Sequence, residues 1–330
     1  MKLNTNPWHQ PILNLLLCTC LLCLVAPARA QQLPATPEPS NTIAVRTELV
    51  SLAVTVTDNQ GRLFTGLGRE DFTIHENGIA QEVSHFSLTD SPASVAVVFD
   101  VSGSMSKDKI ERARTALAHF VATSHGDDEY SLVAFNDRPQ LLLERSRDDR
   151  ALLNRAIHLR PKGGTALYDA LALALAQLQQ GRYAKRALLV ISDGEDNRSR
   201  LSFDKVRRMA QEAGVLVYAV VIADAFTNRG EALRMEELAN SAGGAAFFPG
   251  TADELNDAFA RIALQLRQHY SLGYVPTNFN ADGKWRKLKV KLKPLPGLPK
   301  LIVRNRTGYY ASTDPLAREL AQRSQAEIEQ

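Results

Sequence analysis

The stretch Val95-Ala96-Val97-Val98-Phe99-Asp100-Val101-Ser102-Gly103-Ser104 decides the fold. Its first half is an unbroken apolar run, which is typical of a strand buried on both faces of a sheet. Its second half is rich in oxygen-bearing side chains. Apolar residues then recur at helical spacing, from Ile110 through Leu117 to Val121. A buried strand that ends in polar residues and leads into a helix indicates a parallel α/β sheet.

The same alternation of strand and helix continues along the chain. Further buried strands are expected at 130–135, 187–191 and 215–221. Helices are expected at 166–180, 203–212 and 231–240, and a last helix is predicted to begin with a capping box from Thr251 to Glu254. Residues 94–267 are therefore expected to form an α/β domain with a doubly wound, mostly parallel sheet.

The two flanks of this domain have the period-two apolar pattern of strands. Residues 50–57 alternate before it, and 270–274 and 288–292 alternate after it. Neither flank is large enough to bury a core by itself. We therefore expect residues 43–90 and 268–311 to pair into one small antiparallel β-sandwich.

Two local features of the flanks carry more detailed expectations. The turn Glu76-Asn77-Gly78 is predicted to separate a strand around 72–74 from a strand at 83–86. Residues 301–310 are predicted to form one further strand.

The first thirty residues have the features of an export signal. An apolar run from Ile12 to Val25 follows a single early charge, and Ala28-Arg29-Ala30 offers small residues at the positions that a signal peptidase inspects. We expect a cleaved signal peptide at 1–30 and a periplasmic or secreted protein, with an uncleaved anchor as the alternative. The segment also contains all three cysteines of the chain, Cys18, Cys20 and Cys23. None of them follows the small residue that lipidation requires.

The remaining segments are a linker and a tail, and the overall charge argues against a nucleic-acid partner. Residues 31–42 are proline-rich and are predicted to be a linker, and 312–330 a polar tail. The chain has 39 basic and 36 acidic side chains, a net charge of +3, which is too small to indicate nucleic acid. Membrane contact is expected only through location in the cell envelope, and the sequence leaves the oligomeric state open.

Polar side chains follow several of the predicted strands where each strand ends. Asp100, Ser102 and Ser104 follow the first strand, Thr165 follows Gly163-Gly164, and Asp193 follows the strand at 187–191. In a doubly wound sheet these ends open into the crevice that binds ligands, so the five side chains could converge. Carboxylates and hydroxyls suit a hard cation such as Mg²⁺, whereas zinc prefers histidine and thiolate. Such a site would lack one anionic ligand and should attract a carboxylate.

These five residues resemble the metal-ion-dependent adhesion site of von Willebrand factor type A (VWA) domains, over about residues 94–267. The resemblance implies a VWA or Rossmann-like fold. It also implies that the two serines and the threonine contact the metal, and that the aspartates contact it directly or through water. A Glu or Asp of a protein ligand completes the shell in that family. The expected ion is Mg²⁺, with Mn²⁺ or Ca²⁺ as alternatives.

The flanks extend the resemblance to a bacterial group of exported "VWFA-related" proteins. The residues that carry it are Gly66-Leu67, Asp71-Phe72, Gly164-Thr165-Ala166-Leu167-Tyr168-Asp169-Ala170 and Leu272-Gly273-Tyr274.

Other interpretations fit the same residues less well. Asp-x-Ser-x-Ser at a strand end often only caps the next helix, but three loops would not need to agree for that purpose. Ser104-Met105-Ser106-Lys107 has the S-x-x-K form of penicillin-binding enzymes, yet the accompanying motifs come in the wrong order. Asp100 could be the nucleophile of a D-x-D phosphatase, but Ser102 replaces the second aspartate. Glu195 and Asp196 are interpreted as solvated loop acids.

The sequence therefore favours a non-enzymatic, exported binding or adhesion module that recognises an acidic protein ligand through a divalent cation. The alternative is a structural or regulatory subunit of an envelope complex, in which the metal only stabilises the fold. No nucleophile, base and orienting group occur together in the sequence, which argues against an enzyme.

Overall fold

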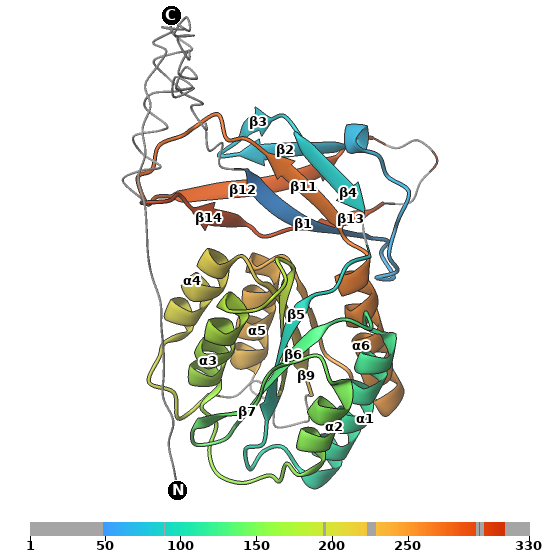
Figure 1. Ribbon diagram of the computed structural model, residues 1–330, viewed down its shortest axis with the longest axis vertical. Coiled ribbons are helices and arrows are strands. Elements are labelled where there is room, and N and C mark those ends of the chain that lie inside the picture. The colour runs from blue at the N-terminus through green and yellow to red at the C-terminus, as the bar shows by residue number, and fades with distance from the viewer. Residues whose placement is uncertain are drawn as a thin grey trace, which may run out of the picture. The chain divides into compact units, whose positions relative to one another are not determined.

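A six-stranded sheet with the order β10-β9-β8-β5-β6-β7 forms the centre of the α/β region (Figure 1). In the computed structural model, residues 49–88, 90–193, 196–222, 229–294, 297 and 300–313 are described. The expected signal peptide and linker, and residues 314–330 of the expected tail, lie outside the described residues. The strands are β5 (Ser94–Asp100), β6 (Glu129–Phe135), β7 (Pro139–Ser146), β8 (Arg186–Ser192), β9 (Leu216–Val221) and β10 (Ala245–Phe247). All pairs are parallel except β6 with β7.

Helices cover both faces of this sheet (Figure 1). One layer holds α1 (Lys107–Thr123), α2 (Asp149–Ile157) and α6 (Ala252–Arg267), and the other holds α3 (Leu167–Gln179), α4 (Phe203–Ala213) and α5 (Arg229–Ser241). Side chains of β5 alternate between the layers, as strand geometry requires. Val95, Val97 and Phe99 share a core with α1, α2 and α6. Ala96 and Val98 share the other core with α3, α4 and α5.

The flanking segments form two four-stranded antiparallel sheets with the orders β13-β1-β11-β4 and β14-β12-β2-β3. Each sheet contains strands from both flanks, and a shared core including Leu52, Ile74 and Leu272 lies between them. The strands are β1 (Val50–Thr57), β2 (Phe72–Glu76), β3 (Ile79–Gln81), β4 (His85–Leu88), β11 (Tyr270–Tyr274), β12 (Trp285–Leu292), β13 (Ile302–Arg304) and β14 (Gly308–Tyr310), and a 3-10 turn, η1 (Arg69–Asp71), precedes β2. The predicted fold class, a mostly parallel α/β sheet with a flanking sandwich, is confirmed.

Several local predictions were wrong. Asn77 and Gly78 have positive φ and form a two-residue turn, so the strand after them is β3 and begins at Ile79. The strand placed at 83–86 is instead β4, which begins at His85 and belongs to the opposite sheet. The single strand expected at 301–310 is two short strands, β13 and β14, also in different sheets.

In the α/β region, the strands β7 and β10 and the helix α2 were not predicted. The capping box of α6 is only half formed. Thr251 Oγ1 accepts a hydrogen bond from the Glu254 amide, but the Glu254 carboxylate accepts from Gly250 instead of Thr251.

The chain passes between the sandwich and the α/β region at 90–93 and again after α6, and these crossings are tied together. Lys185 Nζ donates to the carbonyls of Ser91, at 2.7 Å, and Leu266, at 3.0 Å. Arg267, the last residue of α6, makes a salt bridge with Asp90. Among the described residues, no helix is both long enough and apolar enough to cross a bilayer.

Candidate metal centre

Asp100, the last residue of β5, is held rigidly at the centre of the candidate site. Its side chain is fully buried, Oδ1 accepts from the Ser102 amide at 2.7 Å, and Oδ2 accepts from Ser192 Oγ at 2.6 Å. Burial raises the pKa of the Asp100 carboxyl to about 7, and the negative charge of Asp193 adds to the rise. The protein therefore places a carboxylate where negative charge is unfavourable unless a cation compensates it.

The two serines of the motif lie side by side. Ser102 Oγ and Ser104 Oγ are 2.9 Å apart, with Ser102 buried and Ser104 exposed. The loop that carries them is joined by backbone hydrogen bonds to the loop before Thr165. The Gly103 amide donates to the Gly163 carbonyl at 2.9 Å, and the Lys162 amide donates to the Val101 carbonyl at 2.8 Å.

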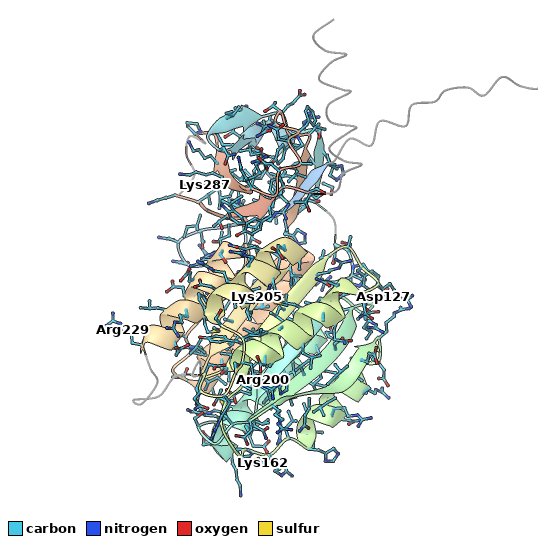
Figure 2. The ribbon with its side chains drawn as sticks, turned by 90° about the vertical axis from the view of Figure 1, so that its left-hand side faces the viewer. Asp127, Lys162, Arg200, Lys205, Arg229 and Lys287 are labelled. Carbon is cyan, nitrogen blue, oxygen red and sulfur yellow. The ribbon has the colours of Figure 1, made fainter. Side chains whose placement is uncertain are left out.

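Hydrogen bonds of its backbone hold Thr165 at the same edge of the sheet. Its side chain is buried, its amide donates to Asn197 Oδ1 at 3.0 Å, and its carbonyl accepts from the amides of Asn197 and Arg198. The loop that follows Asp193 is thereby fastened to the Thr165 loop. Lys162 and Arg200, on these two loops, lie at this end of the α/β region (Figure 2).

Asp193, which directly follows β8, is the least satisfied of the five residues. Its side chain is buried, its Oδ2 lies 3.7 Å from Lys109 Nζ, and its Oδ1 is buried with no hydrogen-bond partner. A buried carboxylate oxygen without a partner is costly, and such atoms are rare in folded proteins unless a ligand completes them.

The residues at this edge fit a divalent cation. A hard cation prefers oxygen ligands. This edge offers the unpartnered Asp193 Oδ1, the adjacent hydroxyls of Ser102 and Ser104, and the buried carboxylate of Asp100, whose negative charge a cation would stabilise. Across the described ranges, no three His, Cys, Asp or Glu side chains gather as a metal-binding group. The donor set of the five candidates is two carboxylates and three hydroxyls.

Several residues that shape the site were missed or misread in the sequence. Ser192 holds the Asp100 carboxylate in place, and its position at the end of a buried strand, directly before Asp193, could have identified it.

The acidic residues of the neighbouring loops also differ from expectation. Asp196 is half-buried instead of solvated, because it accepts from the Tyr168 amide at 3.0 Å and thus caps α3. Glu195 lies outside the described residues. Asp137 Oδ1 accepts from the Gly164 amide at 2.9 Å and supports the loop of Thr165.

Lys109 is the most consequential of the missed residues. It lies in the first turn of α1, is only 6% exposed, and donates from Nζ to the Ser104 carbonyl at 3.3 Å. The sequence around it, Lys107-Asp108-Lys109, has the composition of a solvated helix start, and only the tertiary fold turns Lys109 toward Asp193.

An α/β domain with a candidate cation site at the ends of its parallel strands is the class that the geometry defines. Residues 95–195 match the family described as "von Willebrand factor type A domain". The chain therefore contains a VWA domain.

Curated relatives align with only part of the chain. An uncharacterized protein of Borreliella burgdorferi is 28% identical over 140 residues, which are 39% of this chain and 40% of that protein. Inter-alpha-trypsin inhibitor heavy chain H4 of Homo sapiens is 26% identical over 138 residues, 38% of this chain and 15% of that one. The chain thus spans less than half the length of these relatives. These matches indicate no enzymatic family.

A solved structure with a similar fold is the von Willebrand factor type A protein from Catenulispora acidiphila. It is 13% identical, has a TM-score of 0.48, and covers 83% of this chain and 76% of its own.

Proposed function

We propose that this protein is an exported binding module that recognises an acidic group of a partner protein through a divalent cation. Asp100, Ser102, Ser104, Thr165 and Asp193 would hold the ion, with Mg²⁺ as the expected species and Mn²⁺ or Ca²⁺ as alternatives. The observation that carries the proposal is the buried, unpartnered Oδ1 of Asp193 beside a second buried carboxylate. VWA domains typically mediate protein interactions or adhesion, and the match over 95–195 supports that assignment.

The chemistry of the site follows from its own residues. A bound divalent ion would supply an electrophilic centre for a carboxylate oxygen. Ser192 and the Ser102 amide hold the Asp100 carboxylate in one orientation, so little rearrangement is needed on binding. The exposed side of the site is at Ser104, whereas Asp100 and Asp193 lie beneath it, so a partner's carboxylate would approach past Ser104.

Calorimetry with Mg²⁺ on the wild-type protein and on Asp193→Asn tests the metal site. Asparagine keeps the shape and removes the charge, so it should weaken Mg²⁺ binding by at least about a hundredfold, as expected for losing an ionised ligand in a demanding coordination shell. Equal affinities would refute the site. Asp127→Asn is the matched control, since Asp127 is exposed, pairs with Arg147 and contacts none of the loops that carry the five candidates.

Binding of a partner is tested separately from binding of the ion. Immobilised protein should retain peptides that contain Glu or Asp in the presence of Mg²⁺ and release them with EDTA, whereas their Gln and Asn counterparts should not bind. Strong Mg²⁺ binding without any Mg²⁺-dependent retention would favour the alternative, a structural subunit that the ion only stabilises.

Export is a further part of the proposal, and it rests on the sequence of residues 1–30. Mass analysis of protein from its native envelope should identify Gln31 as the first residue. A native chain that begins at Met1 would instead make the segment an uncleaved anchor.

A further inference from the structure

The position of Lys109 is unusual for a lysine. The N-terminus of a helix carries partial positive charge, so a cation in the first turn is unfavourable there, and burying an ammonium group costs more free energy still. Ser106 caps α1 by accepting from the Lys109 amide at 3.3 Å, which places Lys109 in the first turn of the helix. The ammonium must therefore be compensated by what it faces.

Lys109 faces the candidate metal site. Its Nζ lies 3.7 Å from Asp193 Oδ2, with both side chains 7% exposed or less, and 3.3 Å from the carbonyl of Ser104. Asp193 directly follows Ser192, whose Oγ donates to Asp100 Oδ2 at 2.6 Å, so the two carboxylates lie at the ends of the paired strands β8 and β5. Lys109 thus lies beside the buried carboxylate of Asp193, which shares this edge with the buried carboxylate of Asp100, and beside one of the candidate hydroxyl residues.

We infer that Lys109 is a built-in counter-ion of this site, which stabilises the carboxylate pair when no divalent ion is bound and weakens the binding of that ion. The inference rests on the proposed function. Asp100 and Asp193 would repel each other across a buried site, and the ammonium offsets that repulsion. A divalent ion must enter against the same positive charge.

The same charge defines the class of group that the loaded site recognises. Two carboxylates and a divalent ion are formally neutral together, and Lys109 makes the local charge positive by one unit. An anionic group of a partner is therefore attracted more strongly than a neutral carbonyl or amide would be. Lys109 is in this sense a positioning and selectivity residue and not one of the ion's ligands.

Two substitutions separate the charge of Lys109 from its packing. Lys109→Met keeps an unbranched apolar chain and removes the charge, whereas Lys109→Arg keeps the charge. Lys107→Met is the matched control, because Lys107 is exposed and lies two residues earlier in the same helix. Mg²⁺ affinity is measured by calorimetry and the melting temperature is measured in EDTA and in saturating Mg²⁺, on the full chain.

The inference predicts opposite effects on the two measurements. Lys109→Met should bind Mg²⁺ about tenfold more tightly or better, because charges a few ångströms apart in a buried site change binding constants by at least this factor. Its melting temperature should fall in EDTA and recover in Mg²⁺. Lys109→Arg and Lys107→Met should bind Mg²⁺ within about twofold of wild type. Folding of Lys109→Met only in the presence of Mg²⁺ would be the extreme form of the expected result.

A merely structural lysine would behave differently. Unchanged or weaker Mg²⁺ binding in Lys109→Met, with equal loss of melting temperature in EDTA and Mg²⁺, would overturn the inference and leave the proposed function intact. Absence of Mg²⁺ binding in the wild type would overturn both. If Lys109→Met does not fold under either condition, Lys109→Gln, which keeps a donor for the Ser104 carbonyl, is judged by the same two measurements.

Discussion

Among the described residues, two buried ion pairs have similar N···O distances but very different surroundings. In the α/β region, Asp193 Oδ2 lies 3.7 Å from Lys109 Nζ. In the sandwich, Glu76 Oε1 lies 3.9 Å from Arg286 Nε, with side chains only 3% and 5% exposed. Yet Glu76 Oε2 accepts hydrogen bonds from the hydroxyls of Tyr274, at 2.5 Å, and Tyr309, at 2.9 Å, whereas Asp193 Oδ1 accepts none.

The difference shows that buried charge does not by itself mark a functional site. Arg286 Nη2 also donates to the carbonyl of Asn280 and to Asp282. Arg286 Nε is buried without a hydrogen-bond partner, but it is a donor and cannot be a ligand of a cation, unlike Asp193 Oδ1. Burial and the Glu76 carboxylate raise the pKa of the Tyr309 hydroxyl still further above neutral pH, so Tyr309 donates to Glu76. The two pairs are similarly buried, and what distinguishes the Asp193 pair is a buried carboxylate oxygen without a hydrogen-bond partner, which a cation could use.

The largest effect should come from breaking the sandwich pair. Glu76→Ala leaves the Arg286 guanidinium buried without its acid and two tyrosine hydroxyls without an acceptor. The free energy of unfolding should fall by about 3–5 kcal/mol. Mg²⁺ affinity should stay unchanged. Urea denaturation measures the free energy of unfolding, and calorimetry on the same sample measures the affinity. Glu82→Ala, at a side chain 92% exposed, should change neither quantity. A parallel loss of Mg²⁺ binding in Glu76→Ala would mean that the sandwich pair and the candidate metal site are not independent.

A buried histidine at the junction should make stability depend on pH. Burial, with the Lys185 charge nearby, lowers the pKa of His269 to about 4, from an unfolded value near 6.5. The unfolded chain therefore binds more protons between these values, and this contribution to stability is lost as pH falls from about 6.5 to about 4. The full loss is about 3 kcal/mol.

Urea denaturation at pH 7 and pH 5 measures the larger part of that loss, about 2 kcal/mol. His269→Gln should have a shallower dependence on pH than the wild type, because the other titrating groups are shared by both chains. Equal slopes would mean that His269 is not held neutral in the folded protein.

A smaller effect distinguishes two serines that are two residues apart. Ser104→Ala removes one candidate ligand oxygen and should weaken Mg²⁺ binding about tenfold, because the ion is left short of a ligand. Ser106→Ala removes the cap of α1 and should lower the free energy of unfolding by about 1 kcal/mol with Mg²⁺ affinity unchanged. The reverse pattern, in calorimetry and denaturation, would remove Ser104 from the site.

The fold, and the placement of the candidate residues at one edge of the sheet, could be predicted because both depend on local pattern. Apolar runs such as 95–99 identify buried strands, and the ends of parallel strands share one edge, so Asp100 and Asp193 could be placed together from sequence. The structure keeps these two at one edge and joins the loops of Ser102, Ser104 and Thr165 by backbone hydrogen bonds.

What could not be predicted depends on contacts between distant segments. Lys109 has the sequence context of a solvated helix start, and its burial follows from how α1 packs beside the end of β8. The division of 301–310 between β13 and β14 follows from the choice of partner strands, since both pieces have the same extended pattern. Asp196 caps α3 across a loop contact that no local motif records.

Anomalous diffraction from crystals grown with Mn²⁺ would locate a bound divalent cation directly. Our account predicts one strong peak at ordinary metal–oxygen distance from the hydroxyls of Ser102 and Ser104, on the side of Asp193 Oδ1, and its loss in Asp100→Ala. A peak elsewhere in the molecule, or none at saturating Mn²⁺, would contradict the assignment of this edge as a divalent-cation site.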